Sequence, residues 1–333
     1  MMNKERSTIH DVARMADVST ATVSHVINNT RFVSEQVAKR VRDAMKETNY
    51  RSNYVARALR SSKTKTIGVI IPDITNPFYA RMVHSLEMEL NKYGYGLILC
   101  HSKDDLDREL EQIERLRSWL VDGIMIAPAS STFDYTELSS LQDCPVVYID
   151  RQPNAEQFSG VFCNTHDTVQ YAVEQLILSG HRKIACMLGH VLFSTTMDRK
   201  KGYIDALEKH GIPINPQYIT TGPTTIESGD ERMDYLLKAS DVTAVFAANR
   251  KLSIGAMRRL SASGVKIPEE MAVIGFAAYE WCDITTPALT TVLEPIDDIG
   301  AEAARMMHAR LTDAASAHSI VRLDAYLTQR SSY

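Results

Sequence analysis

Short apolar runs alternate with amphipathic stretches from Thr66 onward, and this alternation restricts the fold more than any other feature of the sequence. The first run, TIGVIIP at residues 66–72, is apolar at nearly every position. Continuous apolar runs of about four to eight residues are typical of parallel strands that are buried on both faces. Comparable runs follow at residues 96–100, 123–127, 146–149, 183–188, 244–247 and 271–275. The stretches between them have helical periodicity, so the body is predicted to be α/β, with parallel sheets covered by helices.

The body is too long for one such sheet. About 265 residues favour two parallel-sheet subdomains, with a ligand cleft at the carboxyl ends of their strands. We expect the first subdomain to comprise roughly residues 66–164 plus 296–320, and the second roughly residues 165–295 plus 321–333. The whole body, residues 66–333, is therefore predicted to be a ligand-binding domain.

Residues 1–50 have a different pattern, that of short helices. Thr8 and Ser19 are suitable N-caps for helices that end near Ala16 and Asn28, and a third helix is predicted from about Ser34 to Thr48. Two short helices joined by a tight turn predict an all-α helix-turn-helix headpiece, whose second helix enters the major groove of DNA. Periodicity alone is equally compatible with an ordinary helical hairpin. Residues 51–65, RSNYVARALRSSKTK, are basic and Ser-rich and are predicted to be a hinge segment.

The distribution of charged residues also divides the chain near residue 65. Residues 1–65 hold 13 Lys+Arg and 6 Asp+Glu, a net charge of +7, which leaves −11 for the remaining residues because the total is −4. A basic segment is suited to the DNA backbone, whereas an acidic body is repelled by it.

Several classes of protein are disfavoured. No run approaches the roughly 18 apolar residues of a transmembrane helix, and the charged N-terminus lacks the apolar core of a secretory signal. The five cysteines are scattered and show no CxxC spacing, so neither a zinc site nor a disulfide framework is expected. The sequence also lacks HExxH, GxSxG, Walker and GxGxxG motifs. We therefore expect a cytoplasmic protein that is not an enzyme, not an exported solute-binding protein, and without a metal or cofactor.

The residues themselves then favour DNA binding over the plain hairpin. The stretch TIHDVARMADVSTATVSHVINNTRFVSEQVAKRV at residues 8–41 resembles the headpiece of the LacI/GalR family of bacterial transcription regulators. Within it, VSTATVSHVINNTRFV is most similar to the purine and ribose repressors of that family. YVARALR matches the hinge segment, and the body matches through IGVIIPDITNPFYARMVHSLE, VDGIMI, SGHRKIA and TPALTTVLEP. The resemblance covers nearly the entire chain in collinear order.

This resemblance implies a set of DNA contacts. The residues that would reach base edges in the major groove are Thr20, Ala21, His25 and Arg31. Those that would mainly contact phosphate are Thr22, Ser24 and Asn28. Leu59 matches the leucine that wedges into the minor groove at the operator centre, with Arg60 beside it. Ala21 stands where the purine repressors have threonine, which leaves the base preference under this position open.

The predicted partners are double-stranded DNA and a second copy of the chain. Two hinge segments must pair to fill one central base step, so the resemblance implies a homodimer on a pseudo-palindromic operator. The chain shows no heptad repeat after Leu311, so a tetramer built on a coiled coil is not expected.

The body resembles a periplasmic sugar-binding protein that serves as a sensor. The residues implied to contact the effector are Asn76, Phe78, Arg151, Arg199, Asn249 and Arg250. Arg199 is the arginine of the family's R-x-x-G-[YF] motif. Phe78 is equally compatible with core packing, and Arg151 with a structural role.

Three departures from the family pattern bear on the effector. Arg250 stands where the family usually has the acid of N-D-x-x-A-x-G, Ala277 where it has the acid of G-[YF]-D, and Cys163 where it often has the acid of D-N. Missing carboxylates disfavour a polyol, whereas an added guanidinium favours a carboxylate or phosphate. We hypothesise an anionic effector such as a sugar acid or sugar phosphate. A regulator controlled by a phosphoprotein partner, with a degenerate cleft, remains open, as does the choice between inducer and co-repressor.

Overall fold

The computed structural model describes residues 7–28, 31–50, 63–276, 281–313 and 317–333, without the side chain of Asn28. These residues form two compact units, one ending at Thr64 and the other beginning at Lys65. Across the described residues, no helix combines the length and apolar character needed to cross a membrane.

The first unit is a three-helix headpiece. Its helices are α1 (Ile9–Met15), α2 (Thr20–Asn28) and α3 (Glu35–Glu47). Thr8 starts α1 as expected, through a reciprocal pair of hydrogen bonds in which its hydroxyl and backbone amide meet Asp11. Ser19 caps α2, because its hydroxyl oxygen accepts a hydrogen bond from the Thr22 amide at 3.1 Å. The three helices pack around a small core of Val12, Ala13, Ala16, Val23, Val41 and Ala44.

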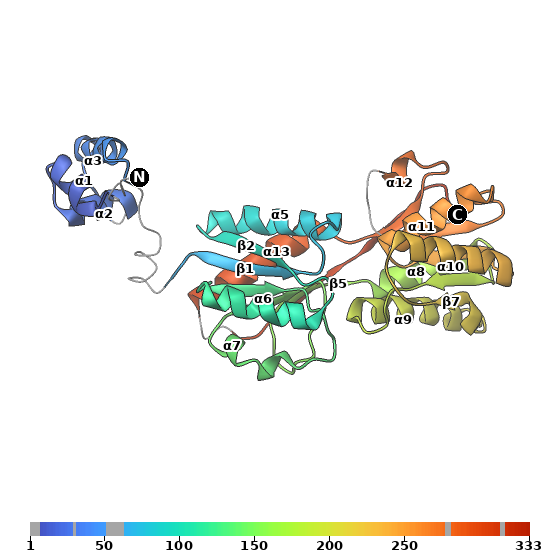
Figure 1. The fold of residues 1–333 in the computed structure, drawn as a ribbon. Coiled ribbons are helices and arrows are strands. Elements are labelled where there is room, and N and C mark those ends of the chain that lie inside the picture. The colour runs from blue at the N-terminus through green and yellow to red at the C-terminus, as the bar shows by residue number, and fades with distance from the viewer. Residues whose placement is uncertain (1–6, 29–30, 51–62, 277–280, 314–316) are drawn as a thin grey trace, which may run out of the picture. The chain divides into compact units, whose positions relative to one another are not determined.

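The second unit contains two six-stranded sheets (Figure 1), in agreement with the predicted pair of parallel-sheet subdomains. In the first sheet the order is β11-β5-β4-β3-β1-β2 and every pairing is parallel. Its strands are β1 (Thr66–Ile71), β2 (Gly96–His101), β3 (Gly123–Ile126), β4 (Val146–Ile149), β5 (Gly160–Asn164) and β11 (Ile320–Asp324).

Helices cover both faces of this sheet. On one face, α5 (Pro77–Lys92) packs against α13 (Ile296–Thr312). On the other lie α6 (Leu106–Ser118), η1 (Tyr135–Glu137) and α7 (Ser139–Gln142), whose apolar residues form a separate core cluster.

The second sheet has the order β12-β10-β9-β8-β6-β7, with β12 as an antiparallel edge strand. Its strands are β6 (Ile184–Met187), β7 (Ile219–Thr220), β8 (Ala244–Ala247), β9 (Ala272–Phe276), β10 (Thr290–Leu293) and β12 (Tyr326–Thr328). Its helices are α8 (His166–Leu178), α9 (Ser194–Lys209), η2 (Pro216–Tyr218), α10 (Ile226–Ala239), α11 (Arg250–Ala262) and α12 (Trp281–Ile284).

The chain crosses between the sheets three times. Two crossings lie after Asn164 and before Ile296. The third lies at Ala325, later than the predicted boundary at residue 321, because residues 320–324 form β11 beside β5 in the first sheet. The end of the chain therefore contributes one strand to each subdomain.

Candidate DNA-reading surface and effector cleft

Helix α2 turns one face to the headpiece core and another to solvent. Val23 is fully buried, whereas Ala21 is exposed and Thr20, Ser24 and His25 are half-buried. This spacing places residues 20, 21, 24 and 25 on one side of the helix. Helix α2 thus presents two hydroxyl groups, a methyl group and an imidazole on one side, and such groups can contact base edges in the major groove.

The remaining predicted DNA contacts divide into two groups. Thr22 is half-buried, with its hydroxyl 3.0 Å from that of Ser19, and Arg31 is exposed after α2. The Asn28 side chain, Leu59 and Arg60 lie outside the part of the chain that the structure describes.

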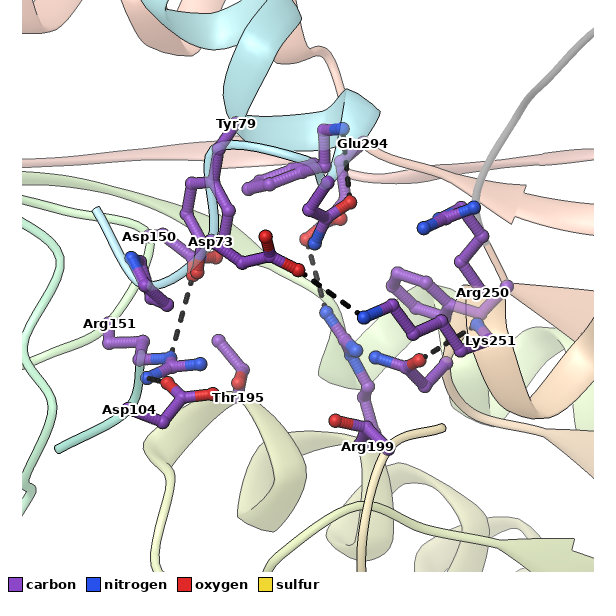
Figure 2. Close-up of a pocket in the computed structure, with 16 residues that line it drawn as sticks. Asp73, Tyr79, Asp104, Asp150, Arg151, Thr195, Arg199, Arg250, Lys251 and Glu294 are labelled. Atoms are coloured by element: carbon purple, nitrogen blue, oxygen red, sulfur yellow. Dashed lines mark hydrogen bonds and ion pairs between the residues drawn. The ribbon is translucent and has the colours of Figure 1, made fainter. Parts of the chain in front are cut away.

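A cleft lies between the two sheets of the second unit, at the carboxyl ends of their strands (Figure 2). It encloses about 120 Å³. All six residues that the sequence predicts as effector contacts line it: Asn76, Phe78, Arg151, Arg199, Asn249 and Arg250. They come from segments that follow β1, β4, β6 and β8, which meet here because carboxyl ends of parallel strands share one edge of each sheet.

Arg151 is held on the first-sheet side of the cleft. One of its terminal nitrogens donates to an Asp104 carboxylate oxygen at 2.6 Å and to the Pro128 carbonyl at 3.1 Å. Its guanidinium lies 3.8 Å from the centre of the Phe193 ring, which belongs to the second-sheet side. Tyr79 donates to Asp150 at 2.5 Å, beside Arg151, and burial raises the pKa of this tyrosine. Arg151 therefore belongs to a buried polar network, which is compatible with the structural role that the sequence left open for it.

Arg199 extends from α9 into the second-sheet side of the cleft. Its terminal nitrogens donate to the Ala248 carbonyl at 3.0 Å and to a Glu294 oxygen at 3.2 Å, and its guanidinium stacks 3.7 Å from the Phe276 ring. Burial raises the pKa of Glu294 to about 7, although the Arg199 charge opposes this rise. Arg199 is thus fixed in orientation, while burial disfavours the charged form of its acidic partner.

One ion pair joins the two sides of the cleft. The Lys251 ammonium lies 3.3 Å from an Asp73 carboxylate oxygen, and each side chain is about one-third exposed. Lys251 belongs to α11 of the second sheet, whereas Asp73 follows β1 of the first. A ligand that fills the cleft has to displace or accommodate this pair.

Three of the predicted contacts also have structural roles. The Asn76 and Asn249 side-chain oxygens cap helices α5 and α11, accepting from Phe78 N at 3.2 Å and Lys251 N at 3.0 Å. Phe78 is 8% exposed and packs edge-to-face on Tyr79. Arg250, at the first position of α11, also lines the cleft.

The sequence interpretation missed the acids of the cleft. Among the described lining residues, four acids stand beside the four bases: Asp73, Asp104, Asp150 and Glu294. A signal was present, because three of these acids follow apolar strand runs directly, in IIPD, VVYID and TVLEP. The loss of acids at three family positions therefore does not leave the cleft without carboxylates. Of the departures, Arg250 lines the cleft, Cys163 is buried in the core, and Ala277 lies outside the described residues.

Comparison with known families decides whether the headpiece is a DNA-binding helix-turn-helix or an ordinary helical hairpin. The profile of bacterial regulatory proteins of the lacI family matches residues 8–53. The profile of periplasmic binding proteins and the sugar binding domain of the LacI family matches residues 64–330, well over half of the chain. The chain belongs to the LacI family. It is a DNA-binding transcriptional repressor of the LacI/PurR type with a ligand-binding C-terminal domain.

Individual relatives agree with this assignment. The HTH-type transcriptional repressor PurR of Aliivibrio salmonicida strain LFI1238 is 33% identical over 309 residues, which cover 92% of this chain and 93% of the relative. A LacI family regulator from Enterococcus faecium, solved with bound ribose, is 28% identical with a TM-score of 0.71, over 80% of this chain and 98% of that one. The Lac repressor dimer bound to operator and an anti-inducer is 23% identical with a TM-score of 0.86, over 98% and 99% of the two chains, and shows the fold alone.

Proposed function

We propose that this LacI-family member is a homodimeric repressor whose affinity for a pseudo-palindromic operator is controlled by an anionic sugar derivative in the cleft. The observation that carries this proposal is the convergence of the six residues implied by the family resemblance on one cleft, around the fixed guanidinium of Arg199. Thr20, Ala21, His25 and Arg31 read bases in this account, Thr22, Ser24 and Asn28 contact phosphate, and Leu59 with Arg60 occupies the minor groove.

The charges of the cleft are compatible with an anionic effector through partner exchange. Burial raises the pKa of Glu294, and an anion that takes its place at Arg199 removes the charge that opposes this rise and so favours protonation of Glu294. A carboxylate or phosphate then replaces Glu294 as the partner of the guanidinium, with two parallel hydrogen bonds. Arg250, which lines the same cleft, supplies a second cation at a position where the family usually has an acid.

The effector class is tested by thermal denaturation of the full chain with D-gluconate, D-glucuronate, ribose 5-phosphate, ribose and glucose. At about 100 times the dissociation constant, a ligand stabilises the folded state by about 2.7 kcal/mol. We expect at least one of the acids to raise the melting temperature by several degrees, and Arg250→Gln to abolish most of that shift.

Arg258→Gln is the matched control, because Arg258 lies on the same helix but pairs with Asp230 outside the cleft. It should retain the wild-type shift. Stabilisation by neutral sugars alone, unchanged in Arg250→Gln, would refute the anionic class. The phosphoprotein alternative gains support if none of the sugars acts and a phosphorylated protein partner is captured instead.

A further inference from the structure

The ion pair between Asp73 and Lys251 joins charges from the two sheets across the cleft. The distance between Lys251 Nζ and Asp73 Oδ2 is 3.3 Å, and both side chains line the cleft. Figure 2 shows the pair reaching from the segment after β1 to the start of α11. Such a pair does two things at once, because it holds the two sides of the cleft together and it occupies the charge of Lys251.

Asp73 is held in position for this contact. Its other carboxylate oxygen, Oδ1, accepts hydrogen bonds from the Thr75 amide at 2.9 Å and from the Thr75 hydroxyl at 2.6 Å. Burial opposes ionisation of Asp73, but the hydrogen bonds from Thr75 and Lys251 outweigh this effect, so the pKa of Asp73 lies below its ordinary value. The carboxylate is therefore charged at neutral pH, with one oxygen anchored in its own loop and the other directed at Lys251.

Lys251 lies in the first turn of α11, which is an unfavourable place for a cation. The backbone amides at a helix N-terminus carry partial positive charge, so cations are destabilised there and anions are stabilised. The described first turn of α11 contains the two bases Arg250 and Lys251 and no acid. Asp73 thus supplies negative charge to this end of α11 from the other sheet.

The ion pair lies at the mouth of the cleft, whereas a chain crossing lies at its floor. The side chains of Asp73 and Lys251 are each 33% exposed, but that of Glu294 is only 5% exposed. Glu294 stands just before the crossing at Ile296. A hinge motion about the crossing moves the mouth further than the floor, so a contact at the mouth resists separation of the two sides most effectively.

We propose that Asp73 is an internal counter-ion of Lys251, which latches the two sides of the cleft and competes with the effector for this lysine. The competition rests on the function proposed above, because it requires an effector with an acidic group, whereas the latch does not. An anion held by Arg199 enters a cleft of about 120 Å³ that Lys251 also lines. Its charge repels the Asp73 carboxylate and offers the Lys251 ammonium a new partner. Lys251 is therefore a further residue that selects acidic ligands.

The latch is tested in the full chain without any ligand, by hydrogen exchange at the Gln152 amide. This backbone amide donates to the Ser194 hydroxyl at 3.0 Å. Gln152 follows β4 of the first sheet and Ser194 begins α9 of the second, so the bond breaks when the two sides separate. We expect Asp73→Asn and Lys251→Met each to accelerate exchange about three- to fivefold, the effect of losing a partly exposed ion pair. Asparagine still accepts the hydrogen bonds from Thr75, so only the charge is lost.

A double-mutant cycle separates the latch from general loosening of the fold. The double variant Asp73→Asn/Lys251→Met should exchange no faster than either single variant, because both substitutions remove the same contact. Lys238→Met is the matched control, since it removes a lysine that pairs with Asp234 within α10. It should leave the Gln152 amide at its wild-type rate. Additive acceleration in the double variant, or a wild-type rate in Asp73→Asn, would overturn the latch.

The competition is tested by isothermal titration calorimetry of the full chain with D-gluconate, D-glucuronate and ribose 5-phosphate. Asp73→Asn should bind an acid about fivefold more tightly than the wild type does, because no internal anion has to be displaced. Lys251→Met should bind it about tenfold more weakly. Unchanged or weaker binding by Asp73→Asn contradicts the competition. If none of the acids binds any of these proteins, the anionic effector and the competition fail together, and the exchange rate of the Gln152 amide still decides the latch.

Discussion

Leu59→Ala is expected to weaken binding to the operator by about 100-fold while leaving binding to non-specific DNA nearly unchanged. In the proposed role, the leucine side chain holds open a kinked base step. Unstacking such a step costs a few kcal/mol, which the wedge and the extra contacts on bent DNA offset. Alanine is too short to fill the step, and a loss of about 2.7 kcal/mol corresponds to 100-fold in affinity. Non-specific binding depends on phosphate contacts, which this substitution leaves in place.

The measurement is fluorescence anisotropy with two duplexes of equal length, an operator obtained by selection from random DNA and a scrambled version of it. Both titrations are made at the same salt concentration, because phosphate contacts make affinity strongly salt-dependent. An equal loss of affinity on the two duplexes would show that Leu59 is not a wedge. The prediction rests on the match of YVARALR to the family hinge.

Arg199→Ala is expected to lower the free energy of unfolding by about 3–5 kcal/mol and to remove the response to the effector. Both members of the Arg199–Glu294 pair are nearly buried, with side chains 10% and 5% exposed. Removal of one partner leaves an uncompensated buried charge or forces Glu294 to bind a proton. Urea unfolding of the full chain measures the loss. The control Arg258→Ala removes a half-exposed arginine whose partner Asp230 keeps Arg259, and it should cost about 1 kcal/mol or less.

The double variant Arg199→Met/Glu294→Leu separates stability from ligand binding. Replacing both charges by apolar groups of similar size should restore most of the lost stability. The effector response should remain absent, because the guanidinium is still missing. A double variant that regains the thermal shift with a sugar acid would assign Arg199 a purely structural role.

The sequence predicted the buried strands and the headpiece helices because their signals are local. Strands such as β3 are buried at every residue and are therefore apolar throughout, and Thr8 and Ser19 are caps that precede their helices directly. The edge strand β11 escaped prediction because its residues alternate between half-buried and exposed. Strand β11 pairs with β5, which is far away in the sequence, and local patterns do not reveal such a pairing. For this reason the boundary predicted at residue 321 precedes the third crossing, which lies at Ala325.

The sequence predicted which positions line the candidate cleft, but it did not predict how the charges in the cleft are paired. Family motifs located six residues that line the cleft, but motifs do not show which charges meet after folding. The Asp73–Lys251 and Arg151–Asp104 pairs join residues 178 and 47 positions apart in the chain. Such pairs depend on which strands end at the same edge, and periodicity alone does not determine that.

The central claim, that a ligand in the cleft controls operator binding, is tested most directly by operator affinity with and without saturating sugar acid. The account predicts that D-gluconate, D-glucuronate or ribose 5-phosphate changes the operator dissociation constant by about tenfold or more. The change should occur in wild-type protein and Arg258→Gln and be absent in Arg250→Gln. An operator affinity that none of these acids alters, or that changes equally in Arg250→Gln, would contradict the account.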